Sequence, residues 1–151
     1  MRLVLPWVLS LALASPALAR WVPPAPSESG PALGVGYPYE CVSSDYAQTV
    51  IMVVGRIDET DQGKVVSVSI RPKDGEVRVA HLPIWERMAN RNCVPLPPFP
   101  AGSPGYEALD DNFEDGYRQW REAFDAKQAG AWTLSPGDIY ATLLKQMPAK
   151  P

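Results

Sequence analysis

The chain has 151 residues and a formal net charge of −3, from 14 Lys and Arg against 17 Asp and Glu. That length fits one domain with its own hydrophobic core. A mildly acidic chain without a basic block is a poor match for nucleic acid or an anionic membrane surface, because both select clustered Lys and Arg.

The first nineteen residues have the layout of a secretory signal peptide. Arg2 precedes a short apolar stretch at 3–14, and the segment ends in small residues at 17–19. We expect cleavage before Arg20 and export to the periplasm or the medium. The alternative is an uncleaved N-terminal anchor, but the apolar stretch is shorter than the roughly 20 residues of a membrane span. After cleavage we expect no membrane span.

The two cysteines, Cys41 and Cys93, both follow the expected cleavage site. In an oxidising compartment an isolated pair predicts one disulfide. Closing a loop of about 50 residues stabilises a fold by roughly 4 kcal/mol in the chain-entropy model. The alternative is a reduced pair in a metal or redox site, which the lack of a C-x-x-C motif and the single histidine disfavour. We therefore predict no metal site and no cofactor.

Composition divides the exported part of the chain. Residues 20–38 are rich in Pro and Gly and predict a flexible leader. A single domain is expected over 39–151, with a Pro-rich internal connector at 94–105. The connector resembles a polyproline II stretch, so it could also be a peptide ligand for an aromatic groove. We favour a stiff surface connector.

Apolar patterns predict the sheet: a continuous apolar run at 50–54 indicates a strand buried on both faces, and period-two alternation indicates the two strands that follow. Three strands are expected at 49–57, 64–71 and 76–82, joined by a polar loop at 58–63 and a Pro-Gly turn at 72–75. Short connections make such strands antiparallel neighbours in a β-meander. Residues 39–42 could add a fourth strand, and Pro83 is expected to end the sheet.

Helical signals follow the strands. A short helix is expected at 84–90 and a longer one at 110–129, and Ser135 is expected to cap a last helix. In the long helix one face collects four aromatic residues at helical spacing: Phe113, Tyr117, Trp120 and Phe124. The predicted fold is α+β: a small antiparallel meander of three or four strands packed against two or three helices, with one disulfide.

His81 is the candidate for acid–base chemistry, as the single histidine. It could act as a general base with a carboxylate. However, it shares phase with Val77 and Val79, which places it on the packed side of its strand. We therefore expect a structural histidine and assign no catalytic residue. One acidic cluster lies in the polar loop at 58–63 and another at the start of the long helix. They fit a solvated hairpin and a helix start better than a paired-carboxylate or calcium site.

Three aromatic residues are the candidates for binding: Trp85, Trp132 and Tyr106. The two tryptophans lie at the ends of predicted elements, where a ring can stay partly exposed and stack on a sugar or anchor a protein. The alternative is that these rings cover the sheet.

The function that fits these observations is an exported, non-catalytic module that binds an envelope protein, a glycan or another component of the cell envelope. Two alternatives stay open. One is a small envelope hydrolase that uses His81 with a carboxylate, and the other is a purely structural envelope protein.

Overall fold

A computed structural model describes residues 30–73, 77–97 and 109–148. Its strands are β1 Pro38–Val42, β2 Thr49–Thr60, β3 Gly63–Pro72, β4 Val79–Trp85 and β5 Cys93–Pro95. Its helices are α1 Glu86–Ala89, α2 Phe113–Asp125 and α3 Pro136–Gln146. Several expected features lie outside the described residues: the signal peptide, most of the leader, Tyr106 and the larger part of the Pro-rich connector.

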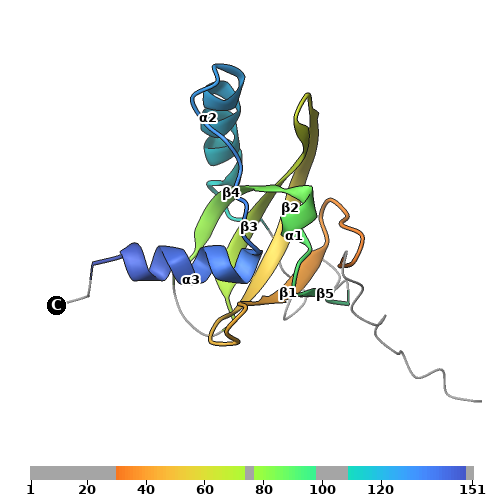
Figure 1. The fold of residues 1–151 in the computed structure, drawn as a ribbon, viewed down its shortest axis with the longest axis vertical. Coiled ribbons are helices and arrows are strands. Elements are labelled where there is room, and N and C mark those ends of the chain that lie inside the picture. The colour runs from red at the N-terminus through yellow and green to blue at the C-terminus, as the bar shows by residue number, and fades with distance from the viewer. Residues whose placement is uncertain (1–29, 74–76, 98–108, 149–151) are drawn as a thin grey trace, which may run out of the picture.

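The five strands form one antiparallel sheet in the order β4-β3-β2-β1-β5 (Figure 1). The α+β fold and the meander of the first four strands are confirmed. Strands β2 and β3 are longer than expected, because the predicted polar loop at 58–63 is mostly strand. Thr60 pairs with Gly63 across a tight turn, and Gly63 has a φ of 124° that favours glycine.

Pro83 does not end the sheet, and the predicted helix at 84–90 is reduced to α1. Strand β4 continues through Pro83 to Trp85. The Pro83 carbonyl oxygen accepts a hydrogen bond from the Trp132 amide (2.8 Å), so this residue directs its backbone polar groups away from β3. A proline is tolerated there because its missing N–H removes no bond from the ladder.

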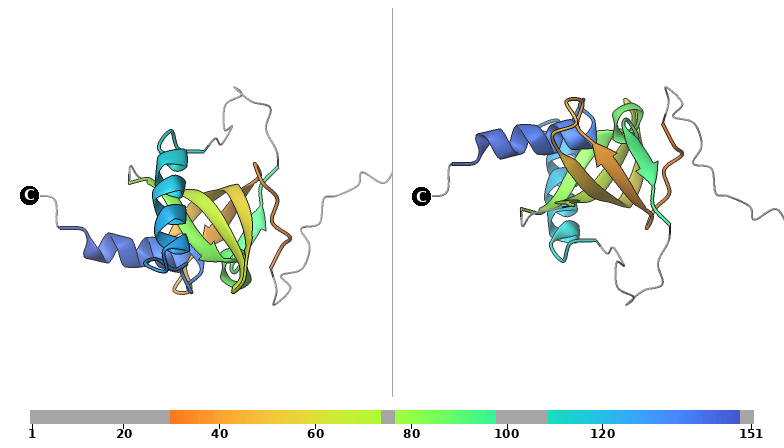
Figure 2. Two further views of the ribbon diagram at one scale, coloured as in Figure 1. Left: turned by 90° about the horizontal axis from the view of Figure 1, so that it is seen from above. Right: turned by 90° about the horizontal axis from the view of Figure 1, so that it is seen from below.

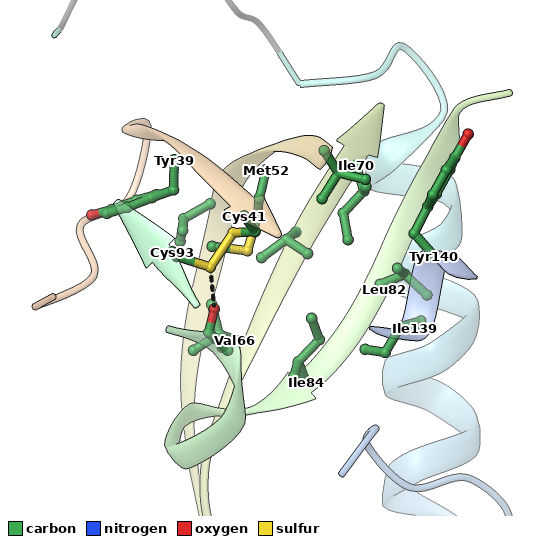
Figure 3. Close-up of a cluster of buried hydrophobic side chains, with 14 residues drawn as sticks. Tyr39, Cys41, Met52, Val66, Ile70, Leu82, Ile84, Cys93, Ile139 and Tyr140 are labelled. Carbon is green, nitrogen blue, oxygen red and sulfur yellow. Dashed lines mark hydrogen bonds between the residues drawn. A yellow bond between two sulfur atoms is a disulfide. The ribbon is translucent and has the colours of Figure 1, made fainter. Parts of the chain in front are cut away.

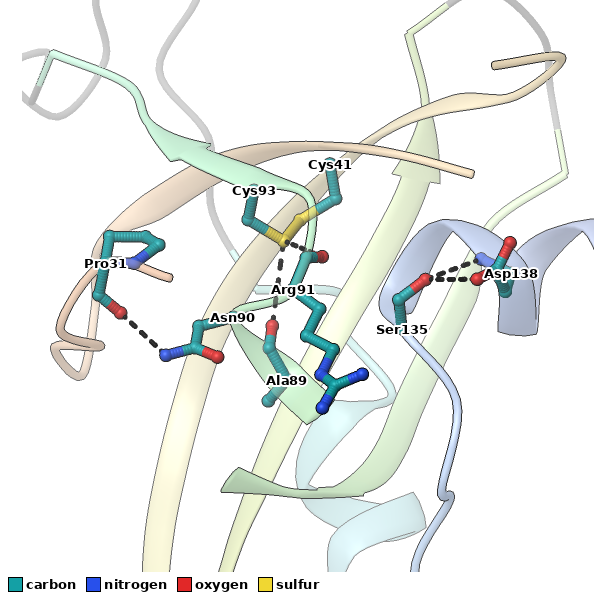
Figure 4. Close-up of a disulfide and its surroundings, with 8 residues drawn as sticks. All are labelled: Pro31, Cys41, Ala89, Asn90, Arg91, Cys93, Ser135 and Asp138. Carbon is teal, nitrogen blue, oxygen red and sulfur yellow. Dashed lines mark hydrogen bonds between the residues drawn. A yellow bond between two sulfur atoms is a disulfide. The ribbon is translucent and has the colours of Figure 1, made fainter. Parts of the chain in front are cut away.

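The Cys41–Cys93 disulfide is confirmed, and it joins two strands (Figure 4). Its cysteines are direct partners in the β1–β5 pair, with Cα atoms 4.0 Å apart. We expected it to tie the sheet to the end of the short helix, but the three-residue strand β5 was not predicted. The Cys93 Sγ also lies 3.3 Å from the Arg91 carbonyl oxygen, a packing contact because a disulfide sulfur has no proton to donate.

The two longer helices lie close to their predicted places. Helix α2 is shorter than 110–129, and in the described part of the chain no helix is long and apolar enough to cross a membrane. Helix α3 begins as expected: Ser135 is its N-cap and accepts a hydrogen bond from the Asp138 amide. Pro136 occupies the first helical position, where its missing N–H costs nothing.

The sheet curls around one hydrophobic core, and a second, smaller core lies outside it (Figures 2 and 3). The inner core holds the disulfide together with side chains from the strands and from α3, among them Met52, Ile84 and Ile139. The outer core lies under α2 and joins Trp120 and Phe124 to Val65 of β3. The predicted aromatic face of α2 is therefore a packing face.

We predict that removing the disulfide lowers stability substantially. The Cys41→Ser/Cys93→Ser double variant should lose about 4 kcal/mol of unfolding free energy, because the 52-residue separation is no longer closed in the unfolded chain. Urea unfolding of the oxidised wild type and the double variant measures this. A difference below about 1 kcal/mol would show that β5 is held by its other contacts.

We also predict that Trp120 anchors α2. It is 8 % exposed, so Trp120→Ala should cost about 3–5 kcal/mol. The matched control is Arg118→Ala on the same helix, whose side chain is 75 % exposed and should change stability by less than about 0.5 kcal/mol. Equal melting temperatures for Trp120→Ala and wild type would contradict the packing.

Candidate functional site

Two of the three predicted binding residues meet, through their backbones. The Trp85 amide donates to the Trp132 carbonyl oxygen (3.1 Å), and the two segments form a parallel bridge next to it. Their side chains are both half-buried but belong to different clusters: Trp85 packs with the outer core and Trp132 with the inner core. Tyr106 lies outside the described residues. Trp85 and Trp132 therefore join the sheet edge to the chain between α2 and α3.

Alternation predicted that His81 and Val79 share a face of the sheet, but in the structure they lie on opposite faces. Val79 pairs with Ile70 and Leu82 pairs with Val68, so β4 contains one extra residue between these pairs. Such a bulge turns the following side chain to the other face. Val79 consequently packs against the inner core, while His81 lies under α2 on the outside of the sheet.

The contacts of His81 are those of a packed side chain. Its Nε2 atom lies 3.1 Å from the Ser67 hydroxyl, which is an arrangement that nucleophilic catalysis also uses. Ser67, however, is 0 % exposed, so this hydroxyl does not face solvent. Burial lowers the pKa of His81 to about 4, which keeps the imidazole neutral near pH 7.

The acidic clusters are engaged in ion pairs and hydrogen bonds. Glu114 pairs with Arg56 (2.8 Å), and Asp58 accepts a hydrogen bond from the Tyr117 hydroxyl (2.9 Å). Burial, followed by the hydrogen bond to Asp58, raises the pKa of Tyr117. Among the described residues, no three His, Cys, Asp or Glu side chains are grouped so that they could hold a metal ion.

The most exposed large apolar side chain of the described residues belongs to a turn that the sequence did not single out. We call residues 43–48, between β1 and β2, the Tyr46 turn. Tyr46 is 84 % exposed and has a φ of 59°, the left-handed region that an aromatic residue seldom adopts. The strained backbone and the exposed ring make Tyr46 the candidate contact residue.

The Tyr46 turn is held closed by its own hydrogen bonds. The Ser43 amide donates to Gln48 (2.9 Å), and the Ser43 hydroxyl accepts from the Gln48 amide (2.9 Å). That hydroxyl also donates to Asp45 (2.6 Å), which accepts from the Ala47 amide (3.0 Å). The hydrogen bonds from Ser43 and Ala47 lower the pKa of Asp45, so the carboxylate that closes the turn is charged near neutral pH.

Helix α3 fixes the turn from outside. The Asp138 carboxylate accepts from the Ser44 amide (2.7 Å), the Ser44 hydroxyl (2.6 Å) and the Ser135 hydroxyl (2.7 Å; Figure 4). Partial burial by itself would raise the pKa of Asp138, but these hydrogen bonds outweigh it and lower the pKa. At Gly137 an added Cβ would lie 2.4 Å from the Ser43 nitrogen. The start of α3 therefore packs directly on the backbone of the turn.

Part of this site had a signal in the sequence. Ser43, Ser44 and Asp45 are residues whose side chains close turns, and a tyrosine directly after them is unusual for a turn tip. The positive sign of φ at Tyr46 had no local signal in the sequence. Neither did the contact between Ser44 and Asp138, which lie 94 residues apart.

Comparison of the chain with models of known protein families, with curated proteins and with solved structures found no match.

We predict that Gly137 is required for the packing of α3 on the turn. Gly137→Ala should lower the unfolding free energy by about 1–3 kcal/mol, because the new methyl group meets backbone that cannot move aside easily. The matched control is Gly130→Ala, where an added Cβ meets nothing within 4 Å. That variant should be neutral or stabilised by up to about 1 kcal/mol. Equal effects of the two substitutions in thermal unfolding would contradict the close contact.

Proposed function

We propose that this chain is an exported, non-catalytic module that binds a protein or another component of the cell envelope, and that the Tyr46 turn makes the contact. The observation that carries the proposal is Tyr46 itself. A large aromatic side chain is 84 % exposed on a backbone that is fixed in an unfavourable conformation.

Rigidity is what makes this exposure useful for binding. A tyrosine offers a large contact area with few rotatable bonds, and tyrosine is enriched among residues that dominate binding energy. A turn that is already ordered loses little conformational entropy when a partner covers it. The hydrogen bonds of Ser43 and Asp138 supply that order before any partner arrives.

The surroundings of Tyr46 also suit a contact surface. Ser44 and Asp45, the two residues before Tyr46, are also exposed, so polar side chains adjoin the aromatic residue in the turn. The alternative, a hydrolase that uses His81 with a carboxylate, has less support, because the hydrogen-bond partner of His81 among the described residues is the buried Ser67 hydroxyl. Export is supported by the disulfide, which is typical of oxidising compartments.

Replacing Tyr46 should separate binding from stability. Tyr46→Gly removes the ring and suits a positive φ, so the unfolding free energy should change by less than about 1 kcal/mol. Affinity for a partner should fall about 30-fold or more, the loss of a binding residue that contributes about 2 kcal/mol. The immobilised chain is first exposed to a cell-envelope extract, and the captured component is then purified and titrated against each variant.

The matched control is Tyr37→Ala. Tyr37 is also an exposed tyrosine, at 53 %, but it precedes β1 whereas Tyr46 follows it. The control variant should retain wild-type affinity. Isolated cell-wall glycan, tested by co-sedimentation, distinguishes a glycan ligand from a protein. The proposal fails if nothing is captured, or if the captured component binds Tyr46→Gly and wild type equally.

A further inference from the structure

Helix α2 rests directly on the His81 side chain. An added Cβ at Gly116 would lie 2.7 Å from the His81 Cβ, so the backbone of the helix contacts the histidine without an intervening side chain. The imidazole ring also lies 5.4 Å from the Phe113 ring, 5.9 Å from Tyr117 and 5.8 Å from Trp120, measured between centroids. The first two turns of α2 therefore pack around this histidine.

The polar groups at this interface come from β3, α2 and β2. On β3 its hydrogen-bond partner is the neutral Ser67 hydroxyl. On α2 the titratable residue in ring contact with it is Tyr117, whose hydroxyl donates to Asp58 of β2. That same Asp58 oxygen lies 3.9 Å from the Arg121 guanidinium, whereas the other oxygen, Oδ2, is buried without a hydrogen-bond partner among the described residues.

The remaining charged groups are paired or lie elsewhere. Arg56 of β2 covers the Tyr117 ring at 4.5 Å and is paired with Glu114. Asp110, before α2, lines a small cavity with Arg71 and Arg78 at the far end of β3 and β4.

We infer that protonation of His81 releases α2 from the sheet while the sheet itself stays folded, so that the aromatic face of α2 becomes exposed at acidic pH. The hydrogen bond to Ser67 engages one of the two ring nitrogens of the neutral imidazole. Protonation adds a second N–H and a charge between aromatic rings. The inner core and the disulfide do not include α2, so the sheet can outlast its release.

The direction and the size of the effect follow from linkage. Burial under α2 lowers the pKa of His81 from 6.5 to about 4. Above pH 6.5 the histidine is neutral whether α2 is docked or released, and docking is unaffected. Between pH 6.5 and 4 the released state binds the proton more strongly, so the docked-to-released ratio falls. Two and a half pH units set a ceiling of about 300-fold on this change.

Hydrogen exchange of the whole chain at pH 7, 5.5 and 4, corrected for intrinsic exchange rates, tests the inference. Protection of the α2 amides should fall by up to about 300-fold between pH 7 and 4, whereas amides at 50–54 of β2 keep theirs. In His81→Gln, which keeps a hydrogen-bonding group but does not titrate, α2 protection should be independent of pH. If α2 does not dock on the sheet in His81→Gln, the experiment uses His81→Phe instead, whose ring fills the same space.

Asp58→Asn is the control for the nearest carboxylate, and it should keep the wild-type pH dependence. His81 is the single histidine of the chain, so its imidazole resonances in wild type are unambiguous. Their titration must coincide with the loss of α2 protection, whether or not the variants fold.

Four results would overturn the inference. They are constant α2 protection in wild type, an equal loss of protection in a folded His81 variant, loss of the pH dependence in Asp58→Asn, and a parallel loss of protection in β2.

Discussion

The cross-strand disulfide is the constraint on which the rest of this fold depends. Strand β5 has three residues, and one of them, Pro95, cannot donate a backbone hydrogen bond. So short a strand gains little from pairing alone, yet it must hold the chain that follows α1 against β1. The Cys41–Cys93 bond fixes this pairing covalently and lies within the inner core. Because β1 is held on both edges, the turn that leaves it starts from a fixed position.

The inner core forms one packed unit, and α2 with the outer core forms a layer attached to the outside of that unit. The inner core is enclosed by the curled sheet and α3, whereas the outer core has three buried members, Val65 of β3 and Trp120 and Phe124 of α2. Helix α2 approaches the sheet closely because Gly55 leaves room for the Phe113 ring, which lies within 3 Å of where a Cβ would stand. A layer held by few buried groups opens at a lower free energy than the core it covers. The separation of the cores is therefore the physical basis for local release of α2.

Local periodicity predicted much of this architecture. A continuous apolar run predicted β2, and alternation predicted β3 and part of β4. The cap at Ser135 was correct because capping is a local interaction. The features that sequence reasoning missed depend on partners distant along the chain. Strand β5 exists because β1 and Cys41 lie beside it, and Pro83 stays in a strand because its polar groups face the sheet edge. The bulge after Val79 moved His81 to the opposite face, a one-residue shift that alternation alone does not predict.

Tyr46, the candidate contact residue, is a further feature that local sequence patterns did not predict. Its left-handed backbone would suit glycine or asparagine better, and the exposed ring adds nothing to either core. Stability alone therefore does not explain a tyrosine at this position. The turn is attached to β1 and, through Asp138, to α3, both of which contribute side chains to the inner core. Among the described residues no hydrogen bond, ion pair or ring contact joins the Tyr46 turn to α2, so opening of the outer layer would leave the turn in place. The proposed contact with a partner and the proposed response to acid thus reside on separate parts of one small fold.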